Sequence, residues 1–296
     1  MTQYSISGSL PVTPPFDFAQ SLHFLAHFPP MYGEQDITAT SLTKAIAVNG
    51  DCVVFRLHGG GTVEQPEVCY TLFSTQALSS ATVQAVIERI AFFLSLGDDL
   101  TSFYAIGRQD PDFAPIITQL YGLHHVKFLT LCEAACWSIL AQRQPIPVAR
   151  KMKRALTEAY GCSVDADGKT FWAFPEREQL TNVSVDELAH LINNERRATY
   201  LHNVIQGLED FGEQFLRTAP YDEAEAALRS IKGIGAWSAA FILMRGLGRM
   251  ERMLLDLKPF LEALPEVYGP DATMEELAQR YGPWFGYWGF YFRVAT

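Results

Sequence analysis

The chain has 296 residues, of which 48% are hydrophobic, and its 33 acidic and 23 basic side chains give a formal net charge of -10. This length allows one large or two medium domains with a sizeable core, and the composition is ordinary for a soluble globular protein. The first ten residues are polar, and no apolar run approaches the ~20 residues of a membrane span. We therefore expect neither a secretory signal nor a membrane helix, and the acidic balance argues against binding a polyanion by overall charge.

The sequence contains five cysteines, at positions Cys52, Cys69, Cys132, Cys136 and Cys162. An odd and scattered set predicts free thiols in a reducing cytoplasm. Cys132 and Cys136 lie one helical turn apart on an apolar segment, where burial as small apolar residues is more common than a zinc or disulfide role.

The first part of the chain, residues 1–108, mixes strand and helix patterns. The strands should form a hairpin with a Gly50–Asp51 turn, joined by one further strand. In chain order the expected elements are a helix after Asp17, strands over 45–48, 52–57 and 68–73, and an amphipathic helix over 82–93.

Two patterns in this first part suggest other chemistry. His58 and the three glycines after it resemble an esterase oxyanion-hole loop, but the sequence has no Gly-x-Ser-x-Gly, so we interpret them as a hairpin loop between Leu57 and Val68. His23 and His27 have metal-ligand spacing without an apparent third ligand nearby, which favours an ordinary helix face.

The second part, residues 109–296, is patterned as helix after helix, separated by Gly and Pro. Pro145 and Pro147 interrupt the helix that ends near Gln142. Gln142 and Arg143 should therefore lie at an exposed helix end.

The most informative stretch joins two helical patterns through glycines. Residues 222–231 carry apolar side chains at helical spacing, and the pattern stops at Gly233. Ile234 stands between Gly233 and Gly235, and a second apolar helix starts at once at Ala236. Such a pair forms a tight hairpin, in which we expect the glycines to allow positive φ and the close approach of a partner.

The start of the second helix is a candidate phosphate site, because its free N–H groups point outward with the helix dipole behind them. An ordinary helix corner is the alternative, but the whole pattern Leu-x-x-Ile-x-Gly-Ile-Gly-x-Trp-x-Ala favours phosphate binding. A grip of this kind holds a nucleic-acid backbone without reading its bases. The residues expected to form it are Lys232, Gly233, Ile234, Gly235 and Ala236.

Positive charge is concentrated in two places on this acidic chain. Residues 134–157 contain five basic side chains and no acid, and the hairpin is surrounded by Arg229, Lys232, Arg245, Arg249 and Arg252. Local basic patches on an acidic body can serve a DNA face, although they can also merely solvate helices.

The hairpin resembles the helix-hairpin-helix of the HhH-GPD superfamily of DNA base-excision glycosylases, in particular the AlkA-like 3-methyladenine DNA glycosylases II. The resemblance implies an α+β fold, with a small N-terminal antiparallel-sheet (TBP-like) domain over residues 1–108 and an all-α glycosylase domain over residues 109–296. No cysteine follows Cys162, so the four-cysteine iron–sulfur loop of endonuclease III-like relatives is excluded. Supporting segments occur in the family's order at 14–18, 25–26, 138–144, 174–175, 196–198 and 282–287.

The resemblance implies a reaction: hydrolysis of the N-glycosidic bond of a damaged nucleotide after its extrusion from the duplex. A carboxylate stabilises the oxocarbenium character of the sugar and orients or deprotonates the attacking water. Family members carry this acid as an Asp at the start of the helix after the hairpin, and Asp256 is the carboxylate at that place.

The sequence departs from the family pattern at this acid. Relatives show paired acids or an Asp followed by Thr, whereas Asp256 stands alone. An ungapped reading places Leu257 at the catalytic position, and a loop one residue shorter restores Asp256. Glu251 is the fallback acid, and a protein that binds DNA without hydrolysing it is the alternative.

Trp237 takes the place at which bifunctional relatives carry a Schiff-base Lys, which implies a monofunctional glycosylase without lyase activity. Alkylated purines are cationic and stack well on electron-rich rings. Gln142 and Arg143 match the segment that, in the family, enters the gap left by the extruded base. The candidate pocket aromatics are Trp237, Phe241, Phe18, Tyr287 and Trp288.

The expected function is therefore excision of alkylated purines of the 3-methyladenine type in base excision repair. The alternatives are a non-catalytic DNA-damage-binding protein and a glycosylase for another lesion, such as 8-oxoguanine or deaminated adenine. The expected partner is double-stranded DNA with a damaged base, bound by a monomer in the cytoplasm, at the nucleoid in a bacterium. We expect no cofactor or metal beyond a monovalent cation, which the family often holds on hairpin carbonyls near residues 232–235.

Overall fold

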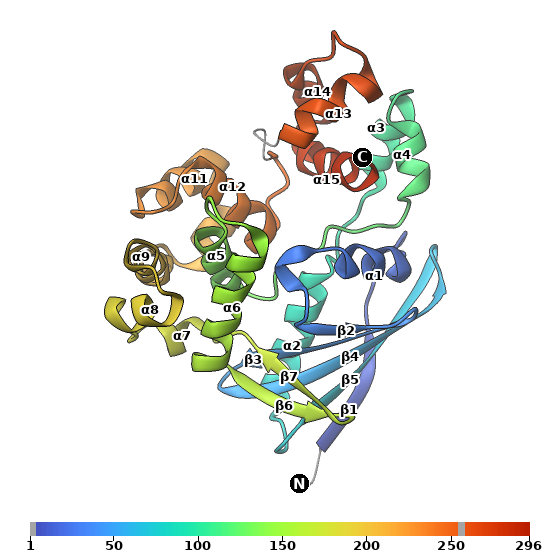
Figure 1. Ribbon diagram of the computed structural model, residues 1–296. Helices are drawn as coiled ribbons and strands as arrows, with labels where there is room; N and C mark the ends of the chain where they lie inside the picture. The colour runs from blue at the N-terminus through green and yellow to red at the C-terminus, as the bar shows by residue number, and fades with distance from the viewer. Residues whose placement is uncertain (1–3, 254–257) are drawn as a thin grey trace.

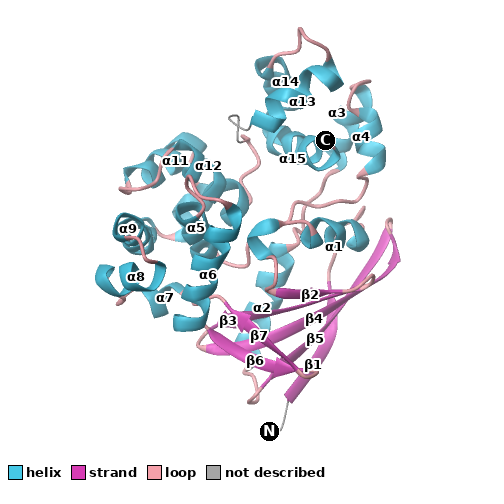
Figure 2. Ribbon diagram, in the orientation of Figure 1, coloured by secondary structure: helices cyan, strands magenta, loops and turns pink. Residues whose placement is uncertain are grey.

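The N-terminal third of the chain forms an antiparallel sheet. The computed structural model describes residues 4–253 and 258–296, and it places the strands together at one end of the molecule (Figure 2). The sheet has the order β1-β5-β4-β3-β2. Its strands are β1 (Tyr4–Leu10), β2 (Gln35–Ile37), β3 (Ser41–Val48), β4 (Asp51–Thr62) and β5 (Gln65–Ser74).

The hairpin between β3 and β4 turns one residue earlier than the Gly50–Asp51 turn that we predict. Val48 pairs with Asp51, so the turn residues are Asn49 and Gly50, with φ of 52° and 77°. A two-residue hairpin turn of this kind needs positive φ at both positions, which Asn-Gly accepts more readily than Gly-Asp.

The glycine run after His58 is strand and not loop. Residues 58–62 continue β4 and pair with the start of β5, up to Thr62 opposite Gln65. The predicted long loop between Leu57 and Val68 is therefore wrong. A Cβ atom at Gly59 would overlap the ring of Phe18, so a glycine there lets the first helix pack against the strand.

Helices cover the sheet and extend away from it (Figure 1). Asp17 caps the first helix by accepting hydrogen bonds from the N–H groups of Ala19 and Gln20. The helices of this main body are α1 (Phe18–Ala26), α2 (Ser80–Phe93), α5 (Leu131–Leu140), α6 (Ile146–Tyr160), α7 (Arg177–Leu180), α8 (Val185–Ile192), α9 (Glu195–Phe211), α10 (Glu213–Thr218), α11 (Tyr221–Ser230) and α12 (Ala236–Phe241).

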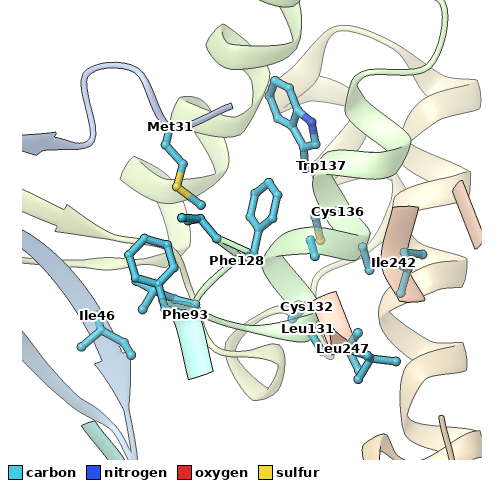
Figure 3. Close-up of a cluster of buried hydrophobic side chains, with 14 of the residues drawn as sticks. Met31, Ile46, Phe93, Phe128, Leu131, Cys132, Cys136, Trp137, Ile242 and Leu247 are labelled. Carbon is cyan, nitrogen blue, oxygen red and sulfur yellow. The ribbon is translucent and has the colours of Figure 1, made fainter. Parts of the chain in front are cut away.

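One hydrophobic core joins the sheet to these helices. Ile46 of β3, Phe93 of α2 and Trp137 of α5 belong to the same cluster of buried side chains, together with Phe128. Figure 3 shows these residues in the region where the three elements meet. The sheet therefore packs against α5 through this core, and α5 packs in turn against the helical hairpin of α11 and α12.

A second hairpin corrects two expectations. β6 (Cys162–Ala166) and β7 (Lys169–Ala173) form a two-stranded sheet within the second part of the chain, so that part is not all-α. Cys52 of β4 and Cys162 of β6 form a disulfide, so the prediction of five free thiols is wrong. Packing of this hairpin against β3 and β4 brings the two sulfurs together across 110 residues, which no local pattern reveals.

A smaller group of helices has its own aromatic core, at the upper right of Figure 1. The predicted domain boundary after residue 108 falls one residue before α3 ends, and the division into 1–108 and 109–296 stays a prediction. No helix within residues 4–253 or 258–296 is long and apolar enough to span a membrane. The group comprises α3 (Thr101–Gln109), α4 (Ala114–Gln119), α13 (Lys258–Tyr268), α14 (Met274–Tyr281) and α15 (Phe285–Ala295).

Candidate active site

The helical hairpin forms as its sequence predicts, with α11 and α12 joined by a short turn. Gly233 has a φ of +113°, and a Cβ atom there would lie 2.6 Å from Cγ of Tyr200, so only glycine suits the position. Gly235 is different: its φ of -94° and ψ of -179° are open to any residue. The expectation that both glycines serve positive φ is therefore wrong for Gly235. A Cβ atom added at Gly235 would meet no atom within 4 Å.

The first turn of α12 faces solvent. Gly235 and Ala236 are exposed, and no side chain of the described residues caps this helix start. Lys232 is exposed as well, whereas Ile234 is buried at 6% exposure. Any contact that a ligand makes with Ile234 would therefore involve its main chain.

Gln142, two residues after the end of α5, supports the hairpin turn. Its Nε2 donates to the carbonyl of Gly233 at 2.9 Å and to Oγ of Ser238 at 3.0 Å. Arg143 next to it is exposed, with a φ of 49°. The side chain of Gln142 thus braces the turn, and Arg143 is the one of the pair that projects outward.

Two of the carbonyls in the range 232–235, where a monovalent cation is expected, accept hydrogen bonds from side-chain amides. Gln142 donates to Gly233, and Nδ2 of Asn203 donates to the carbonyl of Lys232 at 3.0 Å. The turn is therefore hydrogen-bonded by Gln142, which follows α5, and by Asn203 of α9.

A cleft of about 580 Å³ opens beside the hairpin. It is lined by α1 and the turn after it, by α5, by α12 and by α15, so it lies where the main body meets the smaller helix group. Trp237 and Phe241 of α12 stack on its wall, with ring centroids 5.1 Å apart and planes 23° apart. Its aromatic lining consists of Phe24, Phe28, Trp137, Trp237, Phe241 and Phe290.

Three of the predicted pocket aromatics do not line the cleft. Phe18 is 8% exposed and packs against β4 at Gly59. Tyr287 and Trp288 are 1% and 0% exposed in the core of the smaller helix group. The structure therefore does not bring these three rings to the cleft: on α15 it is Phe290 that lines it, while Tyr287 and Trp288 pack inward.

The cleft is cationic in the part of the chain that the structure describes. Arg245 and Arg293 line it, together with His23 and His27, and no carboxylate or lysine does. Burial lowers the pKa of Arg245 to about 9, with the charge of Arg293 adding to the effect. Burial also lowers the pKa of Arg293.

His23 of α1 and His27, the residue after α1, do not form a metal site among the described residues. Nδ1 of His27 lies 2.8 Å from the carbonyl of His23, and the two rings are 4.5 Å apart. Over residues 4–253 and 258–296, no cluster of three His, Cys, Asp or Glu side chains could hold a metal ion.

The proposed catalytic acid lies outside the described residues, as does Leu257. Met253, three positions before Asp256, lines the cleft. Glu251, the fallback acid, pairs with Arg249 at 2.6 Å and is not part of the lining.

Sequence reasoning missed several lining residues. Arg245 was grouped with surface charges, although it follows the apolar run 241–244, which indicates burial. It lies on the π-helical turn Ile242–Gly246 that directly continues α12, a local irregularity frequent at functional sites. Phe24 and Phe28 are spaced one helical turn apart, a pattern that does not separate a cleft wall from a core.

Comparisons with known proteins find DNA repair glycosylases. The chain is 29% identical over 164 residues to a DNA-3-methyladenine glycosylase of Bacillus subtilis, a match that covers 55% of this chain and 54% of that protein. It is 28% identical over 140 residues to a probable bifunctional transcriptional activator/DNA repair enzyme AlkA of Mycobacterium tuberculosis, covering 28% of that protein. The matches thus span about half of the first relative and less of the second. A scan against protein-family models gives no match.

The fold matches over nearly the whole chain. A 3-methyladenine DNA-glycosylase from Archaeoglobus fulgidus superposes with a TM-score of 0.75 at 20% identity, covering 98% of this chain and 97% of that one. An 8-oxoguanine glycosylase/lyase from Clostridium acetobutylicum gives a TM-score of 0.68 at 14% identity, covering 98% of each chain. The chain is therefore similar in sequence, over about half its length, to a DNA-3-methyladenine glycosylase, and it has the fold of solved DNA glycosylases.

Proposed function

We propose that the protein is a monofunctional DNA glycosylase that flips a damaged purine into the cleft beside α12 and hydrolyses its N-glycosidic bond. The observation that carries the proposal is the stacked pair of Trp237 and Phe241, which joins the cleft wall to the hairpin on a single helix. A base extruded from DNA held at the hairpin would reach an aromatic surface within one or two helical turns. The similarity to named DNA-3-methyladenine glycosylases supports alkylated purines as the substrates.

The DNA backbone would be held at the start of α12. The exposed Gly235 and Ala236, with no side-chain cap among the described residues, offer N–H groups to a phosphate, and Lys232 adds a positive charge. Arg143 projects from the neighbouring end of α5 and would contact the gap left by the base. Gln142 would act indirectly by keeping the turn in shape.

We expect no lyase chemistry, because Trp237 stands where a lysine nucleophile would be needed. A Schiff base needs a lysine amine at the sugar, and no lysine lines the described part of the cleft. We expect borohydride to trap no covalent adduct between the enzyme and DNA. A trapped adduct would show that a lysine elsewhere, such as Lys232 or Lys258, acts as a nucleophile.

Asp256 is proposed as the acid that stabilises the oxocarbenium-like sugar. Met253, three residues before Asp256, lines the cleft. The other acid of this loop, Glu251, is already paired with Arg249. Asp256→Asn should retain DNA binding and lower single-turnover base release by about 100-fold, the scale on which single electrostatic groups act. Glu251→Gln is the matched control, because it removes a carboxylate from the same loop and should leave release unchanged.

A DNA-damage-binding protein without hydrolytic activity is the second candidate. It is favoured by the ungapped alignment, which puts Leu257 at the acid position, and by the lack of a carboxylate in the described lining. The deciding experiment is single-turnover release of bases from methylated DNA by the unaltered protein. Release establishes the glycosylase, whereas tight binding of damaged DNA with no release from any lesion establishes the binding protein.

The cellular setting is proposed on the same basis. Double-stranded DNA with a damaged base would be the partner, bound by a monomer in the cytoplasm or at a nucleoid. The division at residue 108 would separate a scaffold, to which the sheet belongs, from the helices that carry the hairpin and most of the cleft. Sedimentation of the protein alone and with a duplex would test the monomer.

A further inference from the structure

Arg245 is a buried cation whose guanidinium is only partly satisfied by the described residues. It is 7% exposed and lines the cleft. Its Nη1 donates to the carbonyl of Val126 at 2.6 Å. Within residues 4–253 and 258–296 no Asp or Glu side chain pairs with it, although an arginine this deeply buried is normally paired.

Three aromatic rings hold the guanidinium in place. Its central carbon lies 5.2 Å, 5.1 Å and 5.2 Å from the ring centroids of Phe24, Phe28 and Phe290. All three rings line the same cleft. The group is therefore fixed before any ligand arrives, which suits a donor that recognises one atom of a substrate.

Among the described residues, the carbonyl of Val126 is the acceptor that Arg245 reaches, so its other donors are open to a ligand. Burial and the nearby charge of Arg293 both oppose the charged form and lower the pKa of Arg245 to about 9. A guanidinium has five N–H donors and no acceptor, so the ligand group that completes it must accept hydrogen bonds.

A purine in the cleft offers two different groups at carbon 6. Guanine-type bases carry a carbonyl oxygen there, which accepts from an arginine, and adenine-type bases carry an amino group, which donates. An amino group facing the guanidinium would leave donors opposed to donors in a desolvated site, which is costly.

We propose that Arg245 selects the base: its guanidinium donates to the carbonyl oxygen at carbon 6, so the cleft prefers guanine-type alkylated purines to adenine-type ones. This inference rests on the proposed glycosylase function and specifies the substrate class of the same cleft. Arg245 would act on specificity, while cleavage itself would remain with the acid.

The test uses DNA treated with a methylating agent, which contains two matched pairs of lesions. 7-Methylguanine and 7-methyladenine share the methyl position and the positive charge, and they differ in the group at carbon 6 and in the amino group that guanine carries at carbon 2. 3-Methylguanine and 3-methyladenine form a second such pair. Bases released in single turnovers are separated by chromatography and normalised to their content in the DNA. We expect the guanine member of each pair to be released about 10-fold faster, the scale of one hydrogen bond to a charged group.

Two substitutions assign this preference to Arg245. Arg245→Met keeps the apolar stem of the side chain, removes all donors and should lower each ratio about 10-fold, because the part of the preference that depends on carbon 6 is lost. Arg245→Lys keeps a charged donor and should lower each ratio less. Arg108→Met is the matched control, because Arg108 stacks on Tyr104 and Tyr121 outside the cleft. Near-ultraviolet circular dichroism verifies that each variant is folded.

Binding of a duplex with an abasic-site analogue separates contact with the base from contact with phosphate. Equal affinity of wild type and Arg245→Met supports the proposal, and a large loss for Arg245→Met shows that Arg245 binds the backbone and overturns it. Should Arg245→Met fail to fold, the wild-type ratios still decide, since equal or adenine-favouring release also overturns the inference and leaves the glycosylase intact. Release of no base at all overturns both.

Discussion

Replacing each glycine of the hairpin by alanine should separate folding from DNA binding. Gly233→Ala forces a side chain onto a residue with a φ of +113° and drives a Cβ atom to 2.6 Å and 2.7 Å from Cγ and Cβ of Tyr200. Backbone strain of this kind costs about 1–3 kcal/mol, and the overlap with Tyr200 adds to it. We expect the free energy of unfolding to fall by about 2–4 kcal/mol, which for a chain of this length lowers the midpoint of thermal unfolding by roughly 3–6 °C.

Gly235→Ala should behave in the opposite way. The backbone at Gly235 is extended, and an added Cβ atom meets nothing within 4 Å, so stability should change by less than about 0.5 kcal/mol. The new methyl group nevertheless stands at the exposed start of α12, where a phosphate would approach. Gly235→Asp adds a negative charge at the same point and should weaken binding to any duplex by roughly 2 kcal/mol, whether or not it carries damage.

Urea unfolding measures the first effect, and fluorescence anisotropy with an abasic-analogue duplex at two salt concentrations measures the second. The alanine pair serves as its own control, because the chemical change is identical and the positions are two residues apart. Unaltered DNA affinity of a folded Gly235→Asp variant would refute the phosphate site. A loss of stability in Gly235→Ala as large as that in Gly233→Ala would refute the conformational reasoning.

Three further predictions concern stability. Reduction of the Cys52–Cys162 disulfide, whose partners are 110 residues apart, should lower the free energy of unfolding by up to about 4–5 kcal/mol, as read from urea midpoints with and without reductant. Burial first, and then nearby cations, keep the pKa of His125 well below 6.5, so the unfolded chain binds a proton that the folded protein does not. Stability should therefore fall as the pH drops from 7 to 5, and His125→Leu should flatten that slope; an unchanged slope would contradict this account. Lys153 is 1% exposed and bonds Glu133 at 2.7 Å, so Lys153→Met should cost about 3–5 kcal/mol in chemical unfolding, whereas a change under about 1 kcal/mol would argue that the ion pair is dispensable.

The position of the proposed catalytic acid depends on the length of one loop. Residues 254–257, which include Asp256, are outside the described part of the chain, so the choice between Asp256 and Leu257 still rests on the length of one loop. The walls of the cleft, in contrast, are formed by elements that are distant in sequence. Its walls come from α1 near the N-terminus and α15 at the C-terminus, as well as from α12.

The sequence by itself determined the features that depend on neighbours along the chain. The hairpin with Gly233 at its turn, the helix after Asp17 and the strand segments 45–48, 52–57 and 68–73 follow from periodicity, caps and turn residues. These signals act over a few residues, and the tertiary structure leaves them nearly unchanged.

Only the tertiary structure decided which side chains share a surface. Phe18, Tyr287 and Trp288 are packed inward, whereas Phe290 and Arg245 face the cleft, although all stand in apolar stretches of similar appearance. The direction in which a buried helix presents a ring depends on the helices packed around it. Packing likewise paired Cys52 with Cys162 and left Arg245 without a carboxylate among the described residues, because long-range contacts have no counterpart in local sequence pattern.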